Sequence, residues 1–276
     1  MKGIVINMKN FGFGVMRLPL FDDSDSKNVD YDKAYEMIKL YMDSGFSYFD
    51  TGYMYHNYYS ENVLRDILVK RFTRESFQHA DKLPVFSLKN KEAVPLIFDE
   101  QLRRCGVDYF DYYLLHCLSA EFYDPKCEPF GCFEFIAQKK REGKVREIGF
   151  SYHDKAELLD RILTEHPEVD FVQLQINYLD WEDEKIQSRI PYALFDYDVN
   201  LEEEALQAVC RLVQPERLTV WMYLDKPNFS WLTQNAKVSP ERFAMVKRYA
   251  RVGIANINNP LDVKEALDYF PDVIDL

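Results

Sequence analysis

YDKAYEMIKLYMDSGFSYFDT, residues 31–51, contains the structural unit that decides the fold. In its first half, apolar side chains recur every three or four residues, which is the period of a helix with one buried face. These side chains are Ala34, Met37, Ile38 and Tyr41. Gly45 follows at a position where the end of a helix favours a left-handed residue. The aromatic segment FSYFDT (46–51) comes next, so the sequence predicts a helix, a tight turn and a strand in succession.

The same alternation continues on both sides of this unit. Short segments rich in aromatic and β-branched residues are separated by amphipathic stretches of helical length. The expected strands cover residues 11–16, 46–51, 79–88, 110–116, 146–151, 171–177, 192–198, 218–224 and 252–258. Strands that alternate with helices predict a mostly parallel sheet, so we assign the chain to the α/β class.

A closed barrel and an open doubly wound sheet can both be built from such a repeat. The (β/α)8 barrel is the commonest closure at about 250 residues. An open dinucleotide-binding sheet carries GxGxxG after its first strand. Here Gly12 and Gly14 lack the third glycine and are followed by Arg-Leu-Pro instead of a helix. We therefore predict a (β/α)8 TIM barrel, with residues 1–276 forming a single domain.

The composition excludes several classes of function. The chain has 276 residues, of which 47% are hydrophobic, and a net charge of −12. A chain this acidic repels nucleic acid and anionic lipid, and no basic run exceeds residues 139–141. Its apolar runs stay far below the ~18 residues of a membrane span. We expect a cytoplasmic protein without nucleic-acid or membrane partners.

The five cysteines form no CxxC pair, so neither a disulfide framework nor a paired-thiolate zinc site is predicted. Intracellular cysteines mostly pack as small apolar residues. One loop keeps a metal site open as an alternative, because it combines two thiols with two carboxylates. Its candidate ligands are Cys127, Cys132, Asp124 and Glu128. The prediction remains reduced thiols and no metal.

Polar residues follow the apolar part of five expected strands. They are Asp50, Lys82, His116, Ser151 and Gln175, with Asn177 close to the last. In a barrel of parallel strands the carboxyl ends converge on one face, and that face carries the chemistry of such folds. A single carboxylate can cap a turn, and a single histidine can be a core residue. Their recurrence at successive strand ends predicts an active site.

Tyr55 lies five residues beyond Asp50, in the loop above the end of that strand. A phenol with a pKa near ~10 is a weak acid at neutral pH unless a neighbouring ammonium favours the phenolate. Lys82 can supply that charge, Asp50 can hold the lysine, and His116 can orient a substrate oxygen. Such a set can protonate an oxygen while hydride reaches its carbon, or perform the reverse step.

Residues 11 to about 188 resemble an aldo/keto reductase. The matching motifs, in family order, are FGFGVMRLP (11–19), GFSYFDTGYMYHNYYSENVLRDIL (45–68), HADKLP (79–84), VDYFDYYLLH (107–116), GKVREIGFSYHD (143–154) and VQLQINYLDWED (172–183). The resemblance implies that Tyr55 is the general acid/base, that Lys82 and Asp50 tune it, and that His116 orients the carbonyl. The implied activity is reduction of an aldehyde or ketone, a small-molecule carbonyl substrate.

The resemblance also implies a nicotinamide cofactor, NADPH and less often NADH, bound without a Rossmann domain. Ser151 and Gln175 match the side chains that hold the nicotinamide carboxamide. Met16 and Arg17 fall where the first strand meets the cofactor.

Two departures from the family pattern lie near these residues. Asp81 precedes Lys82 where the family usually has a small or hydroxyl residue, so a carboxylate could compete for the ammonium, and Lys89 is the alternative lysine. The loop around Tyr55 offers further phenols, of which we expect Tyr53 and Tyr58 to be packing or rim residues. In the same loop His56 could modulate Tyr55, but we expect it to be a solvated loop residue.

The third departure is the last third of the chain, residues 189–276. The chain has 10 glycines, and only Gly253 follows Gly149, although a phosphate cradle needs close backbone approach or a helix N-terminus. The remaining candidates for phosphate contacts are the helix starts near Ser239 and Pro260 and the basic residues Lys226, Lys237, Arg242, Lys247, Arg248 and Arg251. Residues 252–276 faintly resemble the closing unit of glycerophosphodiester phosphodiesterases, which suggests a chimera with a differently derived last third.

Two other functions stay open from the sequence. A barrel with an impaired cofactor site, kept for binding or structure, follows from the missing glycine-rich loop. A metal-dependent phosphodiester hydrolase follows from carboxylates near late strand ends, which suit Mg²⁺ or Ca²⁺. These carboxylates are Asp196, Asp198 and Asp225. The NADPH-dependent reductase remains the leading prediction.

Overall fold

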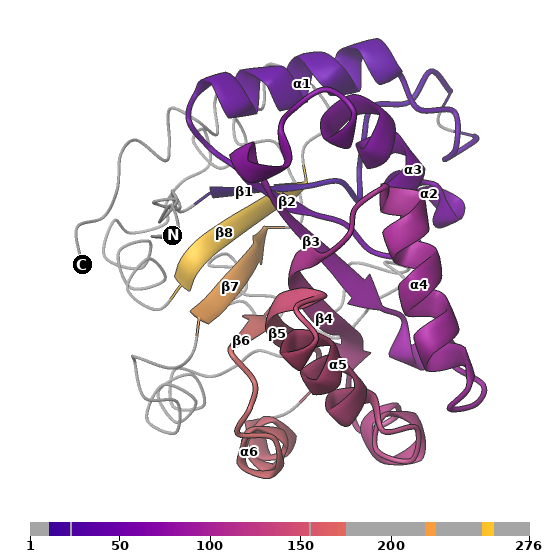
Figure 1. Cartoon of the computed structure of the whole chain (residues 1–276), viewed down its shortest axis with the longest axis vertical. Helices are drawn as coiled ribbons and strands as arrows, with labels where there is room; N and C mark the ends of the chain where they lie inside the picture. Colours follow the sequence, from indigo (N-terminus) through magenta and orange to yellow (C-terminus); the bar gives the residue numbers. More distant parts are fainter. Residues whose placement is uncertain (1–10, 23, 155, 175–218, 225–249, 257–276) are drawn as a thin grey trace, which may run out of the picture.

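The computed structural model describes residues 11–22, 24–154, 156–174, 219–224 and 250–256, and eight parallel strands in this part of the chain form a closed barrel (Figure 1). The strands are β1 (Phe11–Gly14), β2 (Tyr48–Asp50), β3 (Gln78–Leu83), β4 (Phe110–Leu118), β5 (Val145–Tyr152), β6 (Phe171–Leu174), β7 (Thr219–Leu224) and β8 (Ala250–Asn256). They follow one another around the barrel in chain order, and β1 pairs with β8 to close it. The (β/α)8 prediction is confirmed.

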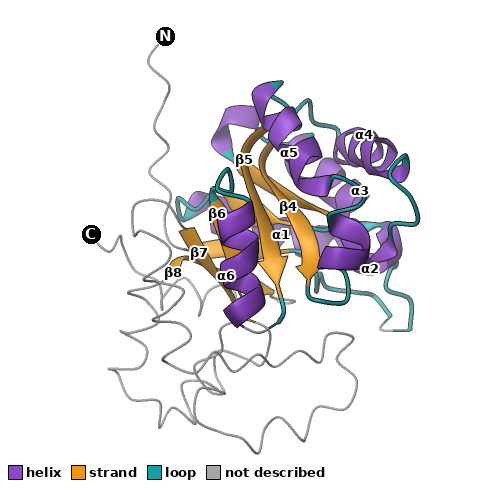
Figure 2. Ribbon diagram, turned by 90° about the horizontal axis from the view of Figure 1, so that it is seen from below, coloured by secondary structure: helices purple, strands orange, loops and turns teal. Residues whose placement is uncertain are grey.

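From β1 to β6, helices connect the successive strands and lie on the outside of the barrel (Figure 2). In the described part of the chain the helices are α1 (Tyr31–Asp43), α3 (Ser60–Leu64), α4 (Ala93–Cys105), α5 (Cys132–Arg141) and α6 (Ala156–Glu165). The short segment α2 (Tyr55–Tyr58) is an irregular turn in the loop after β2, with left-handed backbone inside it. The remaining short helical turns are η1 (Arg65–Val69), η2 (Arg74–Ser76), η3 (Val85–Ser87) and η4 (Tyr123–Cys127).

The unit at 31–51 folds as its sequence predicts. Asp30 caps α1 by accepting a hydrogen bond from the backbone N–H of Lys33 at 3.0 Å. The helix ends before Gly45, which has φ of +83°. The hydroxyl of Tyr41 then donates to the carbonyl of Tyr48 at 2.9 Å and joins the buried face of α1 to β2. Helix capping, the turn glycine and the apolar face therefore act together to place Asp50 at the end of its strand.

The largest difference between the expected and the observed strand boundaries is at the end of β3. The strand expected over 79–88 stops at Leu83, because Pro84 leads into the turn η3. Two of the three strands expected after residue 188 are β7 and β8, which are the two needed for closure. The third, 192–198, lies outside the described residues.

The core has an inner and an outer part. Inside the barrel, small and large side chains from four strands pack together (Tyr48, Ala80, Leu114 and Phe171). Two larger clusters fill the space between the strands and the helices. Gly149 belongs to the tight part of the barrel, because a Cβ atom there would lie 2.5 Å from the carbonyl oxygen of Phe171. A side chain at 149 would push β5 away from β6.

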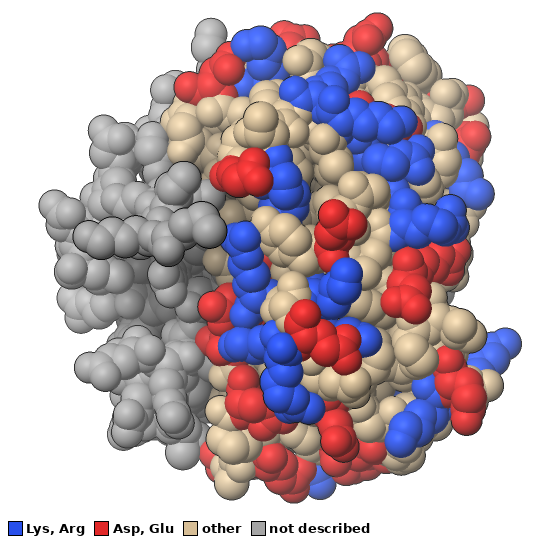
Figure 3. Space-filling view, in the orientation of Figure 1, with Lys and Arg blue, Asp and Glu red and all other residues tan. Residues whose placement is uncertain are grey.

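The described surface carries both signs of charge. Figure 3 shows Lys and Arg side chains interspersed with Asp and Glu over this face of the molecule. No helix among the described residues is both long and apolar enough to cross a membrane.

Candidate functional site

The carboxyl ends of four neighbouring strands bring the predicted site residues together. Asp50 ends β2, Lys82 lies near the end of β3, and His116 and Ser151 lie near the ends of β4 and β5. Their exposed fractions are 0%, 1%, 5% and 4% in that order. Because these strands are parallel and adjacent, residues far apart in sequence meet at one end of the barrel.

A buried ion pair lies at the centre of this group. The ammonium of Lys82 binds a carboxylate oxygen of Asp50 and donates a second hydrogen bond to the carbonyl of Thr51 at 2.6 Å. Burial raises the pKa of Asp50, and the positive charge of Lys82 opposes that rise. The hydroxyl of Tyr48 lies 3.5 Å from the other carboxylate oxygen. The lysine is therefore fixed by two acceptors instead of reaching into solvent.

Tyr55 lies against this ion pair. Its ring centroid is 4.9 Å from the Lys82 ammonium and 5.7 Å from the His116 ring, which it meets edge-to-face. Tyr55 is 8% exposed, so its ring is packed although it comes from a loop. Gly52 allows this packing, because a Cβ atom at position 52 would lie 3.1 Å from Cζ of Tyr55. The structure thus collects the predicted tyrosine, lysine, aspartate and histidine.

The backbone next to two of these residues is in the left-handed region. His56, Asn57 and Tyr58 have φ of 51°, 51° and 67°, and Cys117, directly after His116, has φ of 59°. Such conformations cost of order 1–3 kcal/mol each in residues other than glycine and cluster at functional sites. The strained residues immediately follow Tyr55 and His116, which are the two rings that face each other.

His116 is held in its neutral form. Burial and the nearby Lys82 charge lower the pKa of His116 well below its usual value, and His153 adds to the effect. The ring of Phe86 packs edge-to-face against it at 5.6 Å. A neutral imidazole in this position can donate or accept a hydrogen bond but does not serve as a positive charge.

Asp81 does not compete for the lysine side chain. Successive residues of a strand point to opposite faces, so Lys82 points into the barrel and Asp81 points toward α4, where Cys105 Sγ lies 3.5 Å from Asp81 Oδ2. The contact between the neighbours is through the backbone, because Oδ1 of Asp81 accepts the N–H of Lys82 at 2.8 Å. Lys89, the alternative lysine, is exposed.

A further polar residue, Gln173, lies beside one of the residues expected to contact the cofactor. Gln173 on β6 pairs in register with Ser151, is 4% exposed, and has a side-chain oxygen without a hydrogen-bond partner among the described residues. Gln175 lies outside the described residues. The sequence pattern alone assigns both glutamines to one face of the expected strand 171–177, so it did not select Gln173. The signal that could have found it is its register with Ser151.

The other predicted cofactor contacts lie close to the same end of the barrel. Ser151 Oγ accepts the backbone N–H of Cys117 at 2.8 Å, which ties β5 to the residue after His116. Met16 and Arg17 form the turn after β1 and are partly buried. The carbonyl of Asp50 accepts the N–H of Val15 at 2.9 Å, so this turn starts beside the ion pair.

The loop that carries Tyr55 is anchored to α4 through Arg104. The guanidinium stacks on the ring of Tyr53 at 4.6 Å and donates to the carboxylates of Glu61 at 3.1 Å and Glu100 at 2.6 Å. Glu100 also accepts the hydroxyl of Tyr53 at 2.8 Å. Tyr53 therefore has a packing role, whereas Tyr58 is 41% exposed at the rim.

His56 anchors the opposite side of this loop. Its Nε2 accepts the backbone N–H of Leu18 at 2.9 Å, and its Nδ1 lies 2.8 Å from the carbonyl of Ser26. Both contacts together require the neutral tautomer with a proton on Nδ1. His56 was expected to be a solvated loop residue. It is instead buried and joins the Tyr55 loop to the segment after β1.

We expect acid to loosen this anchor. Burial lowers the pKa of His56 below 6.5, so the unfolded chain binds this proton more readily than the folded one. The free energy of unfolding should therefore fall as the pH drops below about 6.5, by ~1.4 kcal/mol for each pKa unit by which the group is shifted. Urea unfolding at a series of pH values measures this loss. His56→Asn keeps a residue that tolerates left-handed backbone, and it should flatten the dependence relative to the unaltered chain.

The other sequence-based candidates are not part of this site. Cys127 and Cys132 are buried, but Asp124 binds Arg161 at 2.8 Å and Glu128 binds His166 at 3.0 Å. The loop therefore does not present these four groups as one ligand set. The phosphodiesterase carboxylates and all but one of the expected phosphate contacts lie outside the described residues. Arg251 lies in β8, and the structure does not describe its side chain.

Comparison with known proteins agrees with the fold and shows the family. The model of the aldo/keto reductase family matches residues 10–201, which extends past the boundary near 188 expected from the motifs. No curated protein matches the chain. The predicted different ancestry of residues 189–276 is not shown, because solved aldo-keto reductase structures cover up to 97% of the chain.

Three solved structures illustrate the similarity. An aldo-keto reductase from Bacillus halodurans in its holo form is 17% identical, with a TM-score of 0.66 over 96% of this chain and 87% of that one. One from Brucella melitensis is 19% identical, with a TM-score of 0.62 over 96% and 90%. A glycerol dehydrogenase from Gluconobacter oxydans is 14% identical, with a TM-score of 0.61 over 97% and 88%. At these identities the likeness shows the fold, and the match over residues 10–201 shows that this chain belongs to the aldo/keto reductase family of oxidoreductases.

Proposed function

We propose that this oxidoreductase reduces an aldehyde or ketone with NADPH and uses Tyr55 as the general acid. The observation that carries the proposal is the buried Lys82–Asp50 pair beneath the Tyr55 ring, with His116 against the same ring. A phenol, a fixed ammonium and a neutral imidazole at the mouth of a barrel suit the protonation of a carbonyl oxygen.

Each side chain has a separate task in this proposal. Tyr55 donates its hydroxyl proton to the substrate oxygen. The ammonium of Lys82 stabilises the negative charge that the phenol oxygen then carries, and Asp50 keeps the lysine in place. His116, neutral because of its burial, donates a hydrogen bond that orients the carbonyl. Because all four groups are buried, water does not screen these interactions.

The described residues fit a nicotinamide group. A carboxamide needs both a donor and an acceptor, and Ser151 offers a hydroxyl while Gln173 offers a side-chain oxygen that has no partner within the described part of the chain. Both lie inside the barrel on neighbouring strands. We assign the carboxamide contacts to Ser151 and Gln173, with Gln175 as a further candidate and Met16 and Arg17 beside the cofactor. When bound, the cofactor supplies the hydride.

Titration with NADPH, followed by nicotinamide fluorescence, tests the proposal. We expect saturable binding, and absence of binding up to millimolar cofactor would overturn the reductase function. Gln173→Leu removes one buried hydrogen-bonding side chain, which is worth about 1–3 kcal/mol and hence about a 5- to 150-fold loss of affinity. The matched control is Gln138→Leu, the same change on the exposed face of α5, which should leave the affinity unchanged.

NADH in place of NADPH decides the cofactor preference in the same experiment. Tighter binding of NADPH supports the proposed cofactor. Equal or tighter binding of NADH would contradict that assignment and leave the carbonyl reduction in place.

A further inference from the structure

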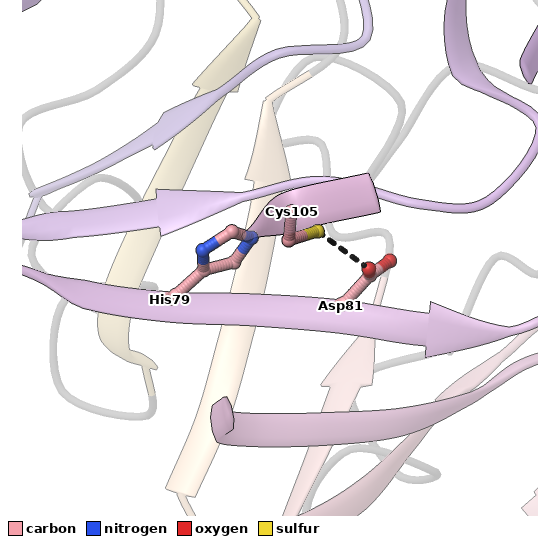
Figure 4. A group of neighbouring side chains, drawn as sticks. All are labelled: His79, Asp81 and Cys105. Atoms are coloured by element: carbon pink, nitrogen blue, oxygen red, sulfur yellow. Dashed lines mark hydrogen bonds between the residues drawn. The ribbon is translucent and has the colours of Figure 1, made fainter. Parts of the chain in front are cut away.

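Three potential metal ligands meet behind the active-site lysine, on the outer side of the barrel. His79 and Asp81 lie two residues apart on β3, so both point toward the helix layer, while Ala80 and Lys82 point inward. Cys105 is the last residue of α4 and faces them. Figure 4 shows the imidazole, the carboxylate and the thiol turned toward one another, and their donor atoms all lie within 4.8 Å.

His79 is the feature that the fold leaves unexplained. It is 0% exposed, and neither ring nitrogen has a hydrogen-bond partner among the described residues. Buried polar atoms are nearly always paired, because an unmade hydrogen bond in the interior costs free energy. Burial also lowers the pKa of His79 to about 3, so the ring is neutral, which is the form that binds metals.

We propose that His79, Asp81 and Cys105 bind a divalent transition-metal cation of the Zn²⁺ class. Imidazole nitrogen, thiolate sulfur and carboxylate oxygen are the three donor types that Zn²⁺ accepts in proteins. Bonds of ~2.0–2.3 Å place tetrahedral ligand atoms roughly 3.3–3.8 Å apart. The Cys105 Sγ to Asp81 Oδ2 distance of 3.5 Å already falls in that range. The three donor atoms lie within 4.8 Å of one another, so a small movement of the His79 side chain would bring its ring nitrogen to the distance that tetrahedral binding requires.

The charges around the three ligands favour a cation. Binding breaks the S–H bond of Cys105, forms a sulfur–metal bond and releases the proton to solvent, so a thiolate and the Asp81 carboxylate together balance a dication. Glu61 interacts electrostatically with Cys105 and by a hydrogen bond with Asp81, and it is 0% exposed. One of its carboxylate oxygens binds Arg104, and the other has no hydrogen-bond partner among the described residues. Glu61 lies outside the group of donor atoms within 4.8 Å, so it could serve as a fourth ligand only after moving toward them.

Burial disfavours the charged form of the two carboxyl groups near the site. Burial raises the pKa of Asp81 to about 6 and that of Glu61 to about 9. On the other side, Arg74 opposes a cation near His79, and Asp111, which binds both Arg74 and Arg146, offsets part of this positive charge. A bound dication would favour the charged form of the Asp81 carboxylate.

Such an ion would also fix the strand that carries the active-site lysine. Asp81 accepts the N–H of Lys82 at 2.8 Å, and Gln101 of α4 donates to the carbonyl of Lys82 at 3.1 Å. A metal that joins Asp81 to Cys105 would cross-link β3 to α4 next to Lys82. Its role would be structural, since the ligand atoms lie on the far side of the strand from Tyr55.

Metal content of the whole protein tests the site. The chain is expressed in Zn²⁺-supplemented medium under reducing conditions, dialysed against a chelator and analysed by inductively coupled plasma mass spectrometry. We expect one Zn²⁺ per chain and a higher Tm than for protein stripped of metal by unfolding and refolding in chelator. In protein grown with Co²⁺, a thiolate-to-metal charge-transfer band should appear in the near ultraviolet.

Matched variants locate the ion. His79→Leu and Cys105→Ser should each lose the metal and the charge-transfer band, whereas Cys132→Ser, a change of another buried cysteine, should retain both. His79→Leu also removes the unpartnered nitrogens, so we expect it to fold without metal and to keep the test valid if Cys105→Ser does not fold. Substoichiometric metal in the unaltered protein, or stoichiometric metal in His79→Leu, would overturn the proposal. Because neither readout depends on NADPH or turnover, the outcome is separate from that of the proposed reductase function.

Discussion

Tyr55→Phe should lower kcat for carbonyl reduction by about 10²- to 10⁴-fold, the usual contribution of a positioned general acid. The change removes the hydroxyl and keeps the ring, so the contacts with Gly52, Lys82 and His116 persist. The fold and the affinity for NADPH should therefore stay close to those of the unaltered protein. Steady-state kinetics with a panel of aldehydes, together with the fluorescence titration, measure both quantities.

The matched control is Tyr58→Phe. Tyr58 lies three residues further along the same loop and is 41% exposed, so loss of its hydroxyl should change kcat little. Equal losses in the two variants would indicate that the loop, not the Tyr55 hydroxyl, limits turnover. Full activity in Tyr55→Phe would exclude Tyr55 as the acid.

Lys82→Met should be strongly destabilising as well as inactive. It leaves the Asp50 carboxyl buried without its ammonium partner, and breaking a buried pair in this way costs about 3–5 kcal/mol. Thermal unfolding should show a Tm far below that of the unaltered chain. Methionine has a length similar to the lysine stem, so the loss reports on charge more than on packing.

A double variant separates stability from chemistry. Asp50→Asn together with Lys82→Met removes both charges, and replacing a complete buried pair is often neutral. We expect the double variant to recover most of the unfolding free energy and to remain inactive, because no ammonium is left beside Tyr55. A double variant no more stable than Lys82→Met would show that the pair itself is not what holds this part of the barrel together.

Two features of the site lower the stability of the fold, and both help to position the reacting groups. Lys82 and Asp50 are charged and almost fully inaccessible, and the residues after Tyr55 and His116 adopt left-handed backbone. Both features are unfavourable for folding alone and useful for fixing reacting groups in place. Anchors on two sides of the loop, Arg104 and His56, hold Tyr55 in this strained segment.

The sequence predicts much of the site because strand ends obey simple geometry. Parallel strands in a barrel bring their carboxyl ends together, so Asp50, Lys82, His116 and Ser151 were expected to be neighbours, and they are. Alternation along β3 also explains why Asp81 does not reach the ammonium. The sequence pattern could not distinguish Gln173 from Gln175, because a period of two predicts the same face of the strand for both. The register between β5 and β6 is what places Gln173 beside Ser151.

By itself, the sequence determined the repeating unit, the closed barrel and the family, because helix period, strand alternation and ordered motifs are properties of short segments. The tertiary structure alone decided that His79 and Asp81 meet Cys105, which lies 24 residues beyond Asp81 in the chain. It also decided that His56 is an anchor for the Tyr55 loop instead of a solvated residue. The physical reason is that a contact between a strand and the end of a helix depends on how far each element extends and how the two pack, and neither quantity is encoded in a local pattern.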